Sequence, residues 1–142
     1  MPRRDMALDK WIEVAKARET ELKNAVRRFV LEHCPRGDVV LFGSRARGDS
    51  HALSDWDIAV LEPAGEYTVR QEEFGQAVHL PLVALDELLE RSMLILDIAH
   101  DGVLLCGRGD HWADLVRKAR DYIREKKLIR TSHGWFPNTP NN

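Results

Sequence analysis

The residues best suited to chemistry lie in the stretch VVLFGSRARGDSHALSDWDIAVL, residues 39–61. Gly43 and Ser44 follow an apolar run, and ten residues later come Asp55 and Asp57, separated by one residue. A glycine lets the backbone turn sharply and approach a ligand, and a serine adds a hydroxyl and an amide suited to a phosphate. Carboxylates in an otherwise apolar strand are costly to bury unless a cation compensates their charge. The stretch therefore predicts metal-assisted phosphoryl or nucleotidyl transfer.

The two acids are expected to point the same way. If residues 55–61 form a strand, alternation puts Asp55 and Asp57 on one face and the apolar residues between and after them on the other. Like charges this close repel each other unless a cation lies between them, and magnesium accepts two such ligands together with water and substrate phosphate. Each half of the pattern is weak alone, because a Gly-Ser pair is commonly an ordinary turn and paired acids are commonly solvated.

The rest of the chain predicts an α/β (or α+β) fold, a small mixed β-sheet flanked by helices. Apolar residues at steps of three and four indicate one long amphipathic helix from Leu8 to His33. Strands are expected over 39–42, 55–61, 77–84 and 103–106, and helices over 87–100 and from Asp110, which is expected to cap the last one. Residues 66–76 are predicted as a short helix or loop. Pro81 places the third strand at an edge or on a bulge.

The composition predicts one cytoplasmic domain. Hydrophobic residues at 44% and charged residues at 31% are typical of a soluble globular protein. There is no apolar run long enough to cross a bilayer, and the N-terminal residues lack the apolar centre of a signal peptide. The formal net charge of −2 argues against an extended nucleic-acid surface. Cys34 and Cys106 lie far apart without a CxxC partner, so reduced thiols are expected.

Gly43-Ser44 followed by Asp55-x-Asp57 on a strand–turn–strand frame resembles the nucleotidyltransferase superfamily related to DNA polymerase beta. In size and layout the chain is similar to its minimal nucleotidyltransferases, the MNT group often encoded beside HEPN-domain proteins in toxin–antitoxin pairs. The resemblance is strongest over residues 39–61 and extends loosely over 20–107. It implies a polymerase-beta-like nucleotidyltransferase core within a single domain over 1–130. The Pro- and Asn-rich residues 131–142 are expected to form a disordered tail.

The resemblance also implies roles for individual residues. The terminal phosphates of ATP or another nucleoside triphosphate would be bound by Gly43, Ser44, Arg45 and Arg47. Asp55 and Asp57 would be the catalytic residues and would ligate Mg²⁺, with Mn²⁺ as an alternative ion. In such sites the protein mainly positions the reacting groups and supplies countercharge.

One position departs from the resemblance. Active relatives carry a third carboxylate on the following strand, which helps to hold the catalytic metal and can assist deprotonation of the attacking hydroxyl. Here that strand reads VHLPLV, residues 78–83, and the register decides whether His79 or Pro81 takes the acidic position. Asp86 and Glu87 are nearby substitutes. Nucleotide binding is therefore expected to be better preserved than turnover.

The sequence-based hypothesis is a Mg-dependent nucleotidyltransferase that transfers a nucleoside monophosphate to a partner protein, with AMP as the favoured nucleotide. The expected partner is a HEPN-type toxin, so that this protein acts as an antitoxin. The alternative is a catalytically weakened nucleotide-binding module that neutralises a partner by direct binding. Transfer to a small molecule is less favoured, because 142 residues leave little room for a second substrate-binding domain. No membrane partner is expected, and a homo- or hetero-oligomeric state is left open.

Overall fold

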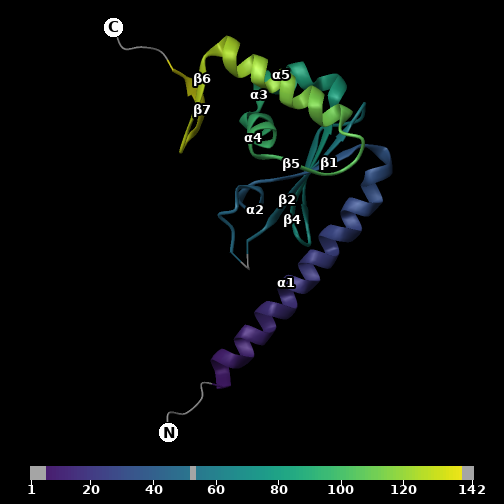
Figure 1. The fold of residues 1–142 in the computed structure, drawn as a ribbon, viewed down its shortest axis with the longest axis vertical. Helices are drawn as coiled ribbons and strands as arrows, with labels where there is room; N and C mark the ends of the chain where they lie inside the picture. Colours follow the sequence, from purple (N-terminus) through teal and green to yellow (C-terminus); the bar gives the residue numbers. More distant parts are fainter. Residues whose placement is uncertain (1–5, 52–53, 139–142) are drawn as a thin grey trace.

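The computed structural model describes residues 6–51 and 54–138, whose course is shown in Figure 1. Within these residues, no helix is both long enough and apolar enough to cross a membrane. In chain order the elements are α1 (Met6–His33), η1 (Cys34–Arg36), β1 (Asp38–Phe42), α2 (Ser44–Arg47), β2 (Trp56–Glu62), β3 (Thr68–Glu72), β4 (Gly75–Pro81), η2 (Leu82–Ala84), α3 (Leu85–Arg91), α4 (Met93–Asp101), β5 (Val103–Cys106), α5 (Asp110–Lys126), β6 (Leu128–Thr131) and β7 (Gly134–Pro137).

Five of the strands form one mixed sheet in the order β3-β4-β2-β1-β5. β1 pairs antiparallel with both β2 and β5, β2 runs parallel to β4, and β3 pairs antiparallel with β4. The predicted small mixed sheet flanked by helices is therefore confirmed. Because β1 and β2 are antiparallel neighbours, the end of β1 and the start of β2 lie at the same edge of the sheet.

The central strands separate two apolar cores, because successive side chains point to opposite faces. Ile58 and Val60 of β2 belong to the core that contains the second half of α1. Ala59 and Leu61 belong to the larger core formed with α3, α4 and α5. Figure 1 shows this arrangement, with α1 running along one side of the sheet and α3–α5 lying on the other.

Helix α1 confirms the predicted helix from Leu8 to His33, but only its second half is packed. Val26 and Phe29 are 7% and 9% exposed, whereas Trp11, on the same predicted apolar stripe, is 58% exposed. In Figure 1 the purple first half of α1 extends past the sheet. The stripe thus continues for several turns beyond the core that its second half enters.

The segment after β2 differs from the prediction. Residues 66–76, expected as a helix or loop, contain β3 and the start of β4, which pair as a hairpin. β4 therefore lies inside the sheet rather than at an edge, and Pro81 is tolerated because it is the last residue of the strand. The helix predicted over 87–100 is divided into α3 and α4 by Ser92, whose extended backbone lets both halves direct apolar residues into the core.

The predicted disordered tail begins with an ordered hairpin. β6 and β7 pair antiparallel, with Thr131 opposite Gly134. Trp135 is 6% exposed, and its indole N–H donates a 2.9 Å hydrogen bond to Asp97 of α4. The prediction of disorder from composition was wrong for this hairpin, because one buried aromatic residue anchors an otherwise polar segment. Residues 139–142 of the predicted tail lie outside the described residues.

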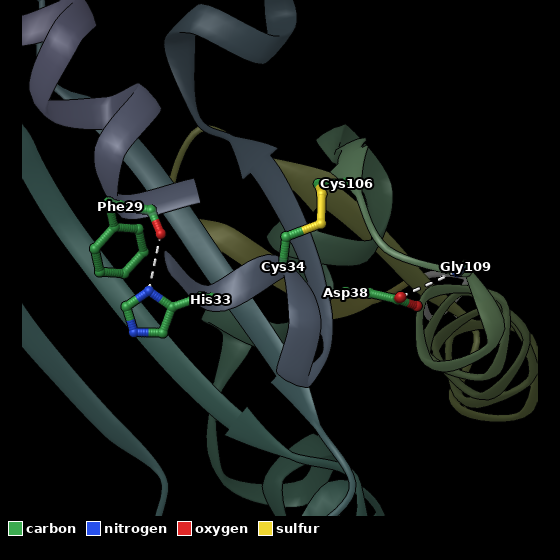
Figure 2. The surroundings of a disulfide bond; sticks show 6 residues. All are labelled: Phe29, His33, Cys34, Asp38, Cys106 and Gly109. Atoms are coloured by element: carbon green, nitrogen blue, oxygen red, sulfur yellow. Dashed lines mark hydrogen bonds between the residues drawn. A yellow bond between two sulfur atoms is a disulfide. The ribbon is translucent and has the colours of Figure 1, made fainter. Parts of the chain in front are cut away.

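A disulfide between Cys34 and Cys106 corrects the expectation of reduced thiols. Their Cα atoms are 5.7 Å apart although 72 residues separate them in the chain. The pairing of Val39 with Cys106 brings β5 to the start of β1, directly after the end of α1. Figure 2 shows the bond joining the two segments. It lies at the start of β1, away from Gly43, which follows the end of that strand.

Asp38, the first residue of β1, caps the start of helix α5 with its side chain. Its side chain is buried, and its carboxylate accepts hydrogen bonds from the backbone N–H of Gly109 at 3.0 Å and of Trp112 at 2.9 Å (Figure 2 shows the first). These are N–H groups at a helix start that the helix itself cannot satisfy. The predicted cap, Asp110, is instead the first helical residue.

Candidate active site

The Gly-Ser turn and the acidic pair meet at one edge of the sheet. Phe42, the last residue of β1, is paired with Asp57 of β2. Gly43 follows directly, and Ser44 begins the short helix α2. Because β1 and β2 are antiparallel, the turn after β1 lies beside Asp57, as the strand–turn–strand prediction expected.

Gly43 is suited to this position in two ways. Its φ of 75° and ψ of −158° lie in a region that residues with a side chain rarely adopt. A Cβ at this position would overlap the carboxylate of Asp57. Glycine therefore lets the backbone pass directly against an acidic side chain, and no larger residue fits without a shift.

Asp55 and Asp57 share one face at the start of β2, although Asp55 itself precedes the strand. Trp56 and Ile58 belong to the opposite core, as alternation predicted. Asp55 is exposed and Asp57 is half-buried. Burial raises the pKa of Asp57, repulsion from Asp55 raises it further, and the positive charge of Arg47 lowers it. The two carboxylates therefore repel each other, and the positive charge of Arg47 offsets part of this repulsion.

Arg45 contacts the residues on either side of Asp55 and the helix α1. Its guanidinium donates hydrogen bonds to the backbone oxygen of Ser54, at 2.9 and 3.3 Å, and lies 4.3 Å from the ring centroid of Trp56. It also lies 3.5 Å from the carboxylate of Glu19 on α1. Only 9% of its side chain is exposed. These contacts hold the loop before Asp55 against α1, which is a structural task.

Arg47 lies on the side of the acidic pair. Its side chain donates hydrogen bonds to Asp49 and to Asp101 of α4, both at 3.1 Å, and 39% of it is exposed. Its charge acts on Asp57, as the pKa of that residue shows. Of the two arginines predicted to assist a phosphate, the structure brings Arg47 to the site and engages Arg45 elsewhere.

A charged cluster that the sequence did not predict supports Arg47. Asp101 accepts two 2.7 Å hydrogen bonds from Arg130 of β6, and only 5% of its side chain is exposed. These bonds hold the pKa of Asp101 well below its usual range. Arg130 also donates to Asp97 at 3.1 Å, and Asp97 accepts from Trp135. The C-terminal hairpin is thereby connected to the turn at Gly43 through α4.

The strand pairing brings a residue beside Asp57 that the sequence analysis did not consider. Asp57 of β2 is paired with Gln76 of the parallel strand β4. His79 is paired with Val60 further along the strand, and its ring lies near His33 of α1, with 5.4 Å between ring centroids. Pro81 ends the strand beside Glu62. Neither of the two residues considered for the sequence, His79 and Pro81, is therefore paired with Asp57.

Asp55 and Asp57 together fit a divalent cation whose other ligands are water and substrate oxygens. Carboxylate oxygens on one face suit magnesium, which is commonly bound by one or two carboxylates together with water and substrate phosphates. In the described residues, no group of three or more His, Cys, Asp or Glu side chains is arranged to hold a metal ion. Because a Cβ at residue 43 would overlap the carboxylate of Asp57, the turn and this carboxylate are close enough to contact the same ligand.

The chain was compared with protein families, curated proteins and solved structures. A family model described as "Nucleotidyltransferase domain" matches residues 20–100. A crystal structure of a toxin–antitoxin with AMP-PNP is similar to this chain at 20% sequence identity, covering 73% of this chain and 91% of that chain with a TM-score of 0.46. A structure of a toxin–antitoxin MntA-HpeT mutant is similar at 18% identity with the same coverages and a TM-score of 0.45. No curated protein matches the chain.

Proposed function

The chain belongs to the nucleotidyltransferase domain family, and on that premise we propose that it transfers a nucleoside monophosphate, AMP as the first candidate, from a nucleoside triphosphate to a partner protein. The observation that supports this most is the contact between Gly43 and Asp57, with Asp55 on the same face. It brings together the turn that we propose binds phosphate and the acids that we propose bind a cation.

In this proposal each residue has one task. Asp55 and Asp57 would hold a magnesium ion, which would offset the charge of the triphosphate and of the leaving pyrophosphate. Gly43 and Ser44 bring backbone amides and a hydroxyl to the phosphates, and Arg47 adds a fixed positive charge. The chain thus contributes position and countercharge, which is the main protein contribution in phosphoryl-transfer sites.

The partner is proposed from the resemblance of Gly43-Ser44 and Asp55-x-Asp57, and of the chain's layout, to minimal nucleotidyltransferases. On this basis the acceptor is a HEPN-type toxin and the protein acts as an antitoxin in the cytoplasm. There the disulfide between Cys34 and Cys106 would meet reductants, since such bonds are rare in the cytosol. Transfer should therefore be assayed with the protein both oxidised and reduced.

The test is transfer of label from α-³²P-ATP to the purified partner in the presence of magnesium. Asp55→Ala should abolish labelling, and because Asp55 is exposed, precedes β2 and repels Asp57, the variant should melt no lower than the wild type. Asp114→Ala, which removes an exposed acid of α5, is the matched control and should label normally. Equal labelling by Asp55→Ala and the wild type would refute the proposed site.

A second function is favoured by Gln76, the amide beside Asp57. With only two acids in the site, the protein would bind a nucleotide with little turnover and neutralise its partner by contact. The discriminating experiment uses the same variant: Asp55→Ala would still suppress the partner's activity if contact suffices, and would fail if transfer is required.

A further inference from the structure

The register of β2 and β4 determines which side chains surround the acidic pair. β4 is parallel to β2, and Gln76 is the residue paired with Asp57. Val78, two residues further along β4, belongs to the same core as Ala59, which lies two residues after Asp57. Alternation therefore places Gln76 and Asp57 on the same face of neighbouring strands. Side chains in such positions lie within reach of one ligand.

The two acids that follow β4 at the start of α3 are engaged elsewhere. Asp86 of α3 accepts a 3.0 Å hydrogen bond from Lys118 of α5. Glu87 pairs with Arg91 at 2.8 Å within the same helix. Neither group faces the turn at Gly43, so Gln76 has no carboxylate substitute from α3.

A glutamine changes what the site can hold. Its side chain has an acceptor oxygen but no negative charge. Two divalent cations placed together require carboxylates to offset their mutual repulsion, and Asp55 and Asp57 supply only two negative charges. One cation bound by these acids can complete its coordination with water and phosphate oxygens.

We propose that Gln76 makes this a site for a single divalent cation, which is bound only together with the nucleotide that brings it. The inference rests on the proposed function, because it concerns the same pair of acids. In this inference, the neutral side chain of Gln76 stands where a second cation would need a charged ligand. The site then retains nucleotide binding, and transfer is slow because no second cation activates the attacking hydroxyl.

The test counts bound ions rather than product. Mn²⁺ is titrated into protein saturated with the non-hydrolysable analogue AMP-PNP, and bound Mn²⁺ is measured by the loss of the free-ion electron paramagnetic resonance signal. The wild type should bind one Mn²⁺ per protein–nucleotide complex and none without nucleotide at the same Mn²⁺ concentration. Gln76→Glu, which adds a charge at unchanged length, should bind two and should also raise the rate of transfer.

Gln71→Glu is the matched control. Gln71 of β3 is paired with Gln76 one strand further from Asp57, and it is exposed. The control adds the same charge without adding a ligand, so it should still bind one Mn²⁺. Two Mn²⁺ ions on the wild type, or one on Gln76→Glu, would overturn the inference and leave the proposed function intact. No binding of AMP-PNP with any cation would instead remove the proposed function itself.

Discussion

The carboxylate of Asp57 lies directly against the α-carbon of Gly43, so closely that a Cβ at residue 43 would overlap it. The two residues come from different elements, the turn after β1 and the strand β2. This contact joins the predicted phosphate-binding turn to the predicted cation ligands. It is therefore the feature whose disturbance should be most informative.

Gly43→Ala should abolish nucleotide binding. The substitution puts a methyl group into the carboxylate of Asp57 and forces an unfavourable φ of 75°, at a cost of about 1–3 kcal/mol in stability. Gly48→Ala is the control, because Gly48 also has a positive φ, of 81°, but a Cβ there would have nothing within 4 Å. Both variants should lose stability in urea, and only Gly43→Ala should lose heat in calorimetry with Mg-ATP. Normal binding by Gly43→Ala would show that the contact is dispensable.

Asp57→Asn should stabilise the free protein while removing ligand binding. Burial and the neighbouring Asp55 both raise the pKa of Asp57 above 3.8, so the folded state binds this proton more tightly than the unfolded state does. Stability therefore falls as the pH rises from 3.8 through the higher pKa of the folded state. At pH 7 Asp57 is charged, and the folded protein carries the full cost of burying that charge. The neutral variant should melt at a higher temperature than the wild type without ligand. With Mg-AMP-PNP the order should reverse, as differential scanning fluorimetry can show.

Arg45→Lys and Arg47→Lys should separate a structural arginine from a ligand-binding one. The first loses the hydrogen bonds to Ser54 and the stacking on Trp56, and should cost about 1–2 kcal/mol in unfolding free energy. Arg47 is more exposed, so its replacement should change stability by less than about 0.5 kcal/mol. It should instead weaken nucleotide binding about tenfold, or about 1.4 kcal/mol. A larger loss of nucleotide affinity in Arg45→Lys than in Arg47→Lys would reverse these assignments.

Reducing the disulfide should destabilise the fold without removing the site. Cys34 and Cys106 close a loop with a sequence separation of 72, for which the chain-entropy model gives about 4 kcal/mol. Cys34 and Gly107, the neighbour of Cys106, line one open hollow, so a small reductant has access. Urea unfolding with and without dithiothreitol should show the loss in the wild type. A Cys34→Ser/Cys106→Ser variant should show no dithiothreitol effect and should still bind Mg-AMP-PNP.

The local part of the site could be predicted from the sequence, because it depends on one strand and one turn. Alternation along 55–61 correctly separated Asp55 and Asp57 from Trp56 and Ile58. The spacing from Gly43 was enough to place the turn at the same edge, since an antiparallel neighbour returns there.

The remaining parts depend on pairings between distant segments. Gln76 was missed because residues 66–76 have too little periodicity to reveal β3 and the start of β4, and an error in the strand start changes every register position. The bond between Asp101 and Arg130 spans 29 residues and forms only once the hairpin docks on α4.

Asp101→Asn should lower the unfolding free energy at pH 7 by about 2–3 kcal/mol, because it removes the charge that holds Arg130 and Arg47 together. The pKa of Asp101 is depressed from 3.8 in the folded state, so its stabilisation is complete above that value and is lost as the pH falls through the lower folded pKa. The difference between wild type and variant in urea should therefore be constant from pH 7 to about pH 5 and should shrink below pH 4. Asp114→Asn, with an exposed ion pair to Arg117, should differ from the wild type by less than about 0.5 kcal/mol throughout. A wild-type advantage that stays unchanged down to the acid limit of folding would show that Asp101 acts through packing rather than charge.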